Sequence, residues 1–293
     1  MSLQFTPLHR HFCAEVTGLD LTCPSAELAA EIDRAMADHA VLVVRGQPLT
    51  QDEQMAFTRS FGALDLGFKK VSNAHTRLKY QELADISNVA EDGSIAQRSH
   101  RRIVNNVANQ IWHSDSSFQN PPARYSMLHA VVIPPKGGAT QFADMRAAYD
   151  ALDADTQAEI EDLLVEHFVL HSRFMLGDTE YSEDKVAAMP RVLWPLVRTH
   201  DDSGRRHLFI GAHASRIDGM SLPEGRLLLS DLLEHATQPQ FVYEHTWEPG
   251  DLVIWDNRCT LHRGRRYDFS QRRELRRSTT LDRTYPTPER AAA

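Results

Sequence analysis

The N-terminal part of the chain shows a helical spacing of apolar residues followed by a β-branched run. Leu28, Ile32 and Met36 follow Ser25 at steps of three to four residues, which is typical of an amphipathic helix with a serine N-cap. The run Ala-Val-Leu-Val-Val at 40–44 comes directly afterwards. This order predicts a helix that leads into a buried strand.

Two further signals flank this unit. Residues 5–21 mix short apolar and polar residues without helical spacing, which indicates one or two edge strands. Thr50 and Glu53 match a capping box, and the apolar pattern continues to Phe61 before a glycine. A second helix is therefore predicted.

The middle of the chain is less regular. Residues 63–109 contain scattered glycine, asparagine and charge, with a strand pattern only at 83–89, so we expect an active-site loop region. Strand patterns at 124–132 and 140–143 flank a Pro- and Gly-rich turn at 134–138. Two antiparallel strands that pair with each other are the expected result.

Helical and β-like patterns alternate in the second half. Residues 144–152 and 155–167 look helical, so 144–190 is predicted to be a helical insertion; 224–236 is a further helix, and 284–293 a frayed tail. The β-like runs are 193–199, 208–211, 241–247 and 251–256. Many short strands with few helices predict a mainly β fold with flanking helices, a jelly-roll or barrel, in one domain spanning 1–293.

Composition limits the classes of protein that this chain can belong to. The 293 residues are 42% hydrophobic, enough for a sizeable core, and no apolar run approaches a membrane span, so no membrane partner is expected. A net charge of −8 argues against a nucleic-acid partner. Cys13, Cys23 and Cys259 form no C-x-x-C pair, so we expect neither a disulfide framework nor a thiolate zinc site, and a cytoplasmic location.

Candidate chemistry starts at Trp-His-Ser-Asp, which places His113 two residues before Asp115. On a strand, both side chains would point to the same face and supply part of a 2-His-1-carboxylate iron site if a second histidine arrives. His262 follows a predicted strand and an Asn-containing turn, and Arg273 and Arg277 lie 11 and 15 residues further on. A single histidine is more often a satisfied core residue than a ligand, so the grouping carries the prediction.

The motifs together resemble the TauD/TfdA family of Fe(II)- and 2-oxoglutarate-dependent dioxygenases. The resemblance rests on WHSDSSF, DMRAAYDAL, GDLVIWDNRCTLHRGRRYD and RRELRRSTTLD, and extends from Leu42 to Asp282. It implies a double-stranded β-helix of the jelly-roll, cupin-like kind. It also implies that Fe(II), 2-oxoglutarate and O₂ are used, and that ascorbate stimulates activity.

The resemblance assigns roles to individual residues. It implies the catalytic metal ligands His113, Asp115 and His262, and a 2-oxoglutarate site at Thr140 and Arg273, with Arg277 beside the metal. Arg277 could contact either the cosubstrate or a substrate carboxylate. The expected substrate contacts are Lys70, Asn109, His200, His213, Arg216 and Arg277.

The implied reaction hydroxylates the carbon between the ether oxygen and the carboxylate of a small anionic aryloxyalkanoate, in a homo-oligomeric enzyme. Two alternatives remain open. A taurine or alkylsulfonate dioxygenase would use the same metal ligands, and a cupin-like protein could bind metal without turnover. The presence of both Thr140 and Arg273 argues against the second alternative, because a metal-binding module needs no dicarboxylate site.

Overall fold

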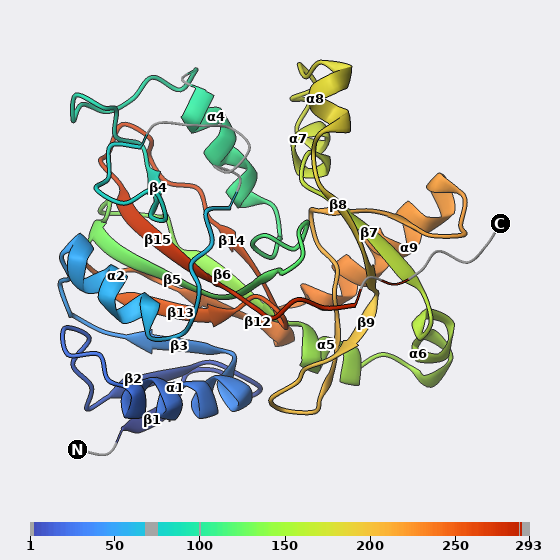
Figure 1. Ribbon diagram of the computed structural model, residues 1–293, viewed down its shortest axis with the longest axis horizontal. Coiled ribbons are helices and arrows are strands. Elements are labelled where there is room, and N and C mark those ends of the chain that lie inside the picture. The colour runs from blue at the N-terminus through green and yellow to red at the C-terminus, as the bar shows by residue number, and fades with distance from the viewer. Residues whose placement is uncertain (1–2, 68–75, 100, 287, 289–293) are drawn as a thin grey trace.

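The computed structural model describes residues 3–67, 76–99, 101–286 and 288, and it is mainly β with helices packed around the sheets (Figure 1). Its largest sheet has seven strands in these residues, in the order β1-β2-β3-β13-β5-β15-β4, and only β2 and β3 are parallel neighbours. The strands are β1 (Gln4–Pro7), β2 (Ala14–Thr17), β3 (Val41–Val44), β4 (Ala84–Ser87), β5 (Ala123–Val132), β13 (Leu252–Asp256) and β15 (Glu274–Leu281).

Three smaller sheets complete the β structure of the described residues. The first contains β12 (Val242–His245), β6 (Thr140–Asp144) and β14 (Thr260–Gly264). The second contains β11 (Ala214–Ile217), β7 (Leu164–Phe168) and β8 (Arg191–Pro195). The third pairs β10 (Arg206–Leu208) with β9 (Val197–Thr199).

Helices cover the outside of these sheets, and both predicted N-caps are confirmed. The Ser25 hydroxyl accepts the Leu28 N–H at the start of α1, and Thr50 forms a capping box with Glu53 at the start of α2. The helices are α1 (Ala26–His39), α2 (Gln51–Arg59), α4 (Arg101–Val107), η1 (Ala108–Gln110), α5 (Met145–Asp150), α6 (Ala154–Ile160), α7 (His171–Met175), α8 (Glu183–Ala187), α9 (Leu222–Ala236) and η2 (Pro239–Phe241). None of the helices in the described residues is long and apolar enough to cross a bilayer.

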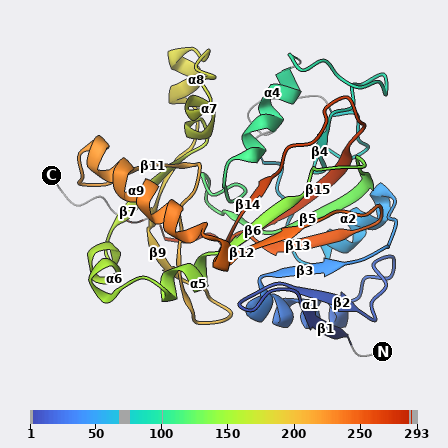
Figure 2. The same ribbon diagram turned by 180° about the vertical axis from the view of Figure 1, so that it is seen from behind.

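Strand β13 shows how the core is divided. Leu252 and Ile254 point to the cluster that includes residues of α1 and α2, whereas Val253 and Trp255 point the other way, towards Phe142 of β6. Successive side chains of a strand alternate between its faces, so β13 is buried on both. The large sheet thus separates α1 and α2 from the β12-β6-β14 sheet, as the view from behind also shows (Figure 2). The turn between β13 and β14 lies next to the site described below.

Several expectations about local structure are wrong. Strands β5 and β6 do not pair with each other but belong to different sheets. The helix predicted at 155–167 ends at Ile160, and β7 follows it, so 144–190 is not entirely helical. Strand β7 pairs with β8 and β11, and these long-range pairings outweigh the local helical pattern.

Two other segments also differ from the prediction. The region 63–109 contains helix α4 besides the expected strand β4. Tyr285 is not frayed, because its N–H donates to Asn120 Oδ1 and its ring packs edge-on against Trp194.

Candidate metal centre and cosubstrate pocket

Two histidines from distant parts of the chain are joined through their backbones. The His113 N–H donates to His262 O at 3.0 Å, and the His262 N–H donates back to His113 O at 2.8 Å. This isolated antiparallel bridge is the β structure found at His113, and Asp115 lies in a turn, so the two residues do not share a strand. The bridge brings the segment that contains His113 and Asp115 to β14, which carries His262.

The three side chains converge on one point. One potential ligand atom from each of His113, Asp115 and His262 lies within 4.8 Å of the other two, and all three residues are buried. The Nε2 atoms of both histidines are 3.8 Å from the Asp115 carboxylate, too far for hydrogen bonds. This spacing suits a metal ion between the groups.

The protonation of the histidines also suits a metal. The His113 Nδ1 lies 2.7 Å from Ile111 O, so this nitrogen carries the proton and donates, which leaves the lone pair of Nε2 pointing into the site. That Nε2 is buried and has no hydrogen-bond partner among the described residues. Burial lowers the pKa of both His113 and His262, and the neutral imidazole is the form that binds metals.

The Asp115 carboxylate is held by two further side chains. Arg277 Nη1 lies 2.6 Å from Oδ1, and the Ser126 hydroxyl donates to Oδ2 at 2.7 Å. These partners fix the orientation of the carboxylate.

A cavity of about 130 Å³ is lined by His262 and by Arg277, the partner of Asp115. One wall comes from strands and their ends. It contains Thr140 of β6, His262 of β14, Arg277 of β15, and Arg273, which directly precedes β15. The other wall comes from α4 and η1, which Figures 1 and 2 both place beside β4 and β14. Asn109 of η1 lines the cavity, as its predicted role requires.

Arg273 is a buried cation without a carboxylate partner in the described parts of the chain. Its Nη2 donates to Gly138 O at 3.0 Å, and the Tyr267 ring lies 5.4 Å from the guanidinium carbon. Its Nε is buried and has no hydrogen bond to any described residue. Burial lowers the pKa of Arg273 to about 10, so the side chain remains charged near pH 7. A buried charge needs a counter-charge, and an anion in the cavity would provide it.

Thr140 is oriented by a neighbouring indole. Trp247 Nε1 donates to Thr140 Oγ1 at 3.0 Å. Since an indole N–H can only donate, the threonine hydroxyl keeps its own hydrogen for another acceptor. Thr140 and Arg273 together therefore present two donors to the cavity.

Comparison with known proteins identifies the family. Residues 4–279 match the model described as "Taurine catabolism dioxygenase TauD, TfdA family". The chain belongs to the TauD/TfdA family. It is 63% identical to the alpha-ketoglutarate-dependent 2,4-dichlorophenoxyacetate dioxygenase of Cupriavidus pinatubonensis over 96% of this chain and 99% of that protein. It is 60% identical to the enzyme of the same name from Burkholderia sp. over 97% and 96%.

A solved structure agrees with this assignment. The crystal structure of AAD-2 in complex with Mn(II) and N-oxalylglycine superposes with a TM-score of 0.90 at 48% identity, covering 99% of this chain and 100% of that one. N-Oxalylglycine is an analogue of 2-oxoglutarate. A protein of this fold thus accommodates both a divalent metal and a dicarboxylate.

The substrate contacts expected for this family member are only partly brought together. The His213 ring lies 6.4 Å from the His113 ring and 5.0 Å from that of Phe118, close to the metal ligands, and its Nδ1 is buried without a partner among the described residues. Lys70 lies outside the described residues.

The structure places His200 and Arg216 elsewhere. The His200 Nε2 lies 3.0 Å from Asp256 Oδ2, and its Nδ1 lies 2.9 Å from Ser203 Oγ, so both nitrogens are used away from the cavity. Arg216 lines a separate cleft and lies 3.4 Å from Glu166. Neither residue lines the cavity in this structure, and each is paired with another polar side chain, so their predicted role as substrate contacts stays a prediction.

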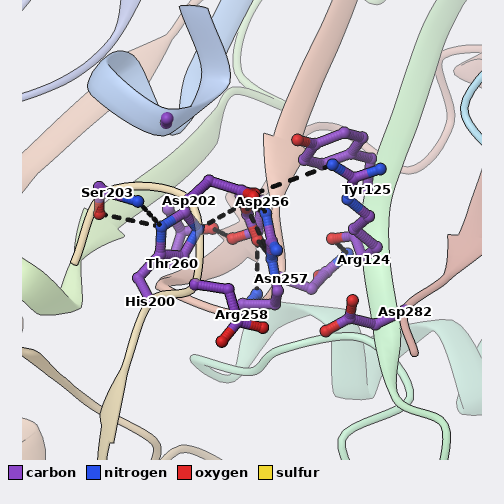
Figure 3. A network of polar contacts seen from close by, with 12 residues as sticks. Arg124, Tyr125, His200, Asp202, Ser203, Asp256, Asn257, Arg258, Thr260 and Asp282 are labelled. Carbon is purple, nitrogen blue, oxygen red and sulfur yellow. Dashed lines mark hydrogen bonds and ion pairs between the residues drawn. The ribbon is translucent and has the colours of Figure 1, made fainter. Parts of the chain in front are cut away.

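A second group, His200, Asp256 and Cys259, also has metal-like spacing. The carboxylate in this group belongs to Asp256 and already forms a salt bridge with Arg258, whose Nη2 lies 2.6 Å from Oδ2. A cation in this place leaves no room or charge for a metal ion, so we assign the group to the structural network shown in Figure 3.

Proposed function

We propose that this chain is an Fe(II)- and 2-oxoglutarate-dependent dioxygenase that oxidises aryloxyalkanoates such as 2,4-dichlorophenoxyacetate. The observation that carries the proposal is the His113, Asp115 and His262 triad beside a cavity lined by Arg273, a buried cation that no carboxylate of the described residues pairs with. The names of the relatives that share 60% and 63% of its residues support this substrate class.

The net reaction balances as a coupled oxidation. The aryloxyacetate, 2-oxoglutarate and O₂ give a phenol, glyoxylate, succinate and CO₂. One oxygen atom enters the carbon between the ether oxygen and the carboxylate, and the other enters succinate. The resulting hemiacetal then breaks its bond to the aryl oxygen, which leaves as the phenol.

His113, Asp115 and His262 would hold the metal ion. Fe(II) in such a site supplies the activation of O₂ that couples 2-oxoglutarate decarboxylation to substrate hydroxylation. The donors of Thr140 and Arg273 would hold the distal carboxylate of 2-oxoglutarate. The guanidinium can do so with two parallel hydrogen bonds, which fix the orientation of the cosubstrate.

The substrate would approach from the side of Arg277 and His213. Arg277 is partly exposed, lines the cavity and has a buried Nε without a partner among the described residues, so it can contact a second anion while Nη1 remains on Asp115. Asn109 and Lys70 complete the proposed set of substrate contacts. A cation beside the metal would place the carbon next to the substrate carboxylate within reach of the oxidant.

Three wider properties form part of the proposal. The packing of the large sheet on β12-β6-β14 supports a double-stranded β-helix of the jelly-roll kind. The free thiols of Cys13, Cys23 and Cys259 support a cytoplasmic location. We also propose a homo-oligomer that binds neither nucleic acid nor membrane.

The test is 2-oxoglutarate decarboxylation with Fe(II) and ascorbate, measured as succinate against a panel of aryloxyacetates, aryloxypropionates, alkylsulfonates and cinnamates. We expect the highest kcat/KM with an aryloxyalkanoate, together with stoichiometric phenol. A preference for alkylsulfonates would replace the substrate class by the taurine-like alternative. Absence of succinate with every substrate would contradict the enzyme assignment.

A further inference from the structure

The buried amide of Asn257 interacts with the metal ligand Asp115 directly, and also through Ser126. Its Oδ1 accepts the backbone N–H of Asp115 at 3.1 Å. Its Nδ2 donates to Ser126 Oγ at 2.9 Å, and Ser126 donates to Asp115 Oδ2 at 2.7 Å. One side chain thus reaches both the backbone and the carboxylate of the same ligand.

The orientation of this amide is determined by its neighbours. Trp255 Nε1 also donates to Asn257 Oδ1, at 3.0 Å, and an indole can only donate. On the other side, Nδ2 faces Arg124 O at 3.3 Å, which can only accept. A flipped amide would point its N–H groups at the N–H donors of Trp255 and Asp115, and its oxygen at the carbonyl oxygen of Arg124. The oxygen therefore faces Asp115 and the nitrogen faces Ser126.

The direction of the next hydrogen bond follows from the same reasoning. An ionised carboxylate can only accept, so the single Ser126 hydrogen points to Asp115. The lone pairs of Ser126 Oγ then accept from Asn257 and from Thr279 Oγ1, which lies 3.0 Å away. Each bond in this series polarises the next and strengthens the hold on Oδ2.

A charged network fixes the turn that carries Asn257. Asp256 accepts from Arg258 Nε at 2.9 Å and lies 3.0 Å from His200 Nε2, and Arg258 also reaches Asp202 (Figure 3). Burial opposes the ionisation of Asp256, but Arg258 and His200 outweigh it and hold the pKa of Asp256 well below its usual range. These contacts hold the turn between β13 and β14, and Asn257 lies in its interior, with 1% of its surface exposed.

We propose that Asn257 is a positioning residue that sets the orientation of the metal ligand Asp115. It touches neither metal nor substrate, and acts through the Asp115 backbone and through Ser126. Outer hydrogen-bond partners of this kind typically change metal affinity about 10- to 100-fold when removed. This inference rests on the proposed function, because it concerns the proposed metal site.

The experiment measures Mn(II) binding to the intact chain without turnover, from the electron paramagnetic resonance signal of free Mn(II). We expect Asn257→Ala to weaken binding about 10- to 100-fold. Ser126→Ala removes the bond to Oδ2 but keeps the bond from the Asp115 N–H to Asn257, so it should weaken binding less. The double variant should lose less than the sum of the two single effects, because part of the action of Asn257 passes through Ser126.

Thr260→Val is the matched control. It removes a hydrogen bond from Thr260 Oγ1 to Asp256 O in the same turn without touching Asp115. We expect this variant to lower the melting temperature but to keep Mn(II) affinity within about threefold of wild type, below the range expected for a lost outer partner. The visible spectrum of the Co(II)-substituted protein should change in Asn257→Ala and stay unchanged in Thr260→Val.

Two results would overturn the inference. Asn257→Ala could bind Mn(II) as tightly as wild type, or Thr260→Val could weaken binding as much at an equal loss of melting temperature. If Asn257→Ala does not fold, Ser126→Ala decides, and unchanged Mn(II) affinity in that variant has the same meaning. Failure of the wild-type protein to bind Mn(II) would instead contradict the metal site itself.

Discussion

Arg273→Lys tests the cosubstrate site through both geometry and charge. The guanidinium is buried and donates to Gly138 O, and a lysine offers a single terminal nitrogen that cannot make two parallel bonds to a carboxylate. Loss of one hydrogen bond to a charged group costs about 1.5–3 kcal/mol. We expect the dissociation constant of 2-oxoglutarate to rise about 10- to 100-fold at pH 7.

The pH dependence of 2-oxoglutarate affinity is a second quantity that tests the same site. Burial lowers the pKa of Arg273 from 12.5 to about 10. The same loss of hydration applied to a lysine, whose usual pKa is about 10.4, gives a pKa of about 8. The anion binds the charged form, so affinity is lost as pH rises through the pKa of the free protein. The variant should lose about another tenfold between pH 7 and 9, whereas wild type should stay nearly constant.

Titration calorimetry of 2-oxoglutarate into the Mn(II)-loaded protein under nitrogen measures both effects. Arg272→Lys is the control, because Arg272 is the exposed neighbour and pairs with Glu274 at 2.8 Å. We expect this control to bind like wild type. An Arg273→Lys dissociation constant within threefold of wild type, with the same pH slope, would show that Arg273 does not hold the cosubstrate.

Three further outcomes are expected. Asp115→Ala should abolish turnover and Mn(II) binding while the far-ultraviolet circular dichroism spectrum is retained, and normal turnover would contradict the assigned ligands. Wild type should prefer an aryloxyacetate over its neutral amide about tenfold to a hundredfold in kcat/KM, which corresponds to about 1–3 kcal/mol of transition-state stabilisation. Arg277→Ala should lose this preference. Equal losses of activity on both substrates would show that Arg277 does not contact the substrate carboxylate. A reducing agent should leave the melting temperature unchanged, because Cys13, Cys23 and Cys259 are free thiols; a fall of several degrees would reveal a disulfide.

Local sequence signals predicted local structure well. Ser25 and Thr50 start their helices as expected, because an N-cap depends on residues only three positions away. The helix predicted at 155–167 is wrong beyond Ile160 for the opposite reason. Its apolar residues at Ile160, Leu163 and Leu164 fit a helix, yet 164–168 is the central strand between β8 and β11, and neither partner is near in sequence.

The residues of the site show the same difference between local and long-range signals. The spacing of His113 and Asp115 indicated a ligand pair, but the pairing with His262 needed the family resemblance, because their backbone bridge joins distant segments. Asn257 has no distinctive signal in a single sequence. It looks like an ordinary turn residue, and only its two contacts to Asp115 and Ser126 reveal a further role.

The unequal walls of the cavity have a consequence for how such a protein can diversify. The groups proposed to hold metal and dicarboxylate sit on paired strands or are joined to them, where a substitution disturbs several neighbours at once. The facing wall is a short helical segment whose Ile103, Asn106 and Val107 reach the cavity from a single stretch of chain. Mutations gathered in that stretch can alter the shape offered to a substrate while the oxidising machinery is inherited intact. A library restricted to these three positions is therefore the economical starting point for changing specificity in the laboratory.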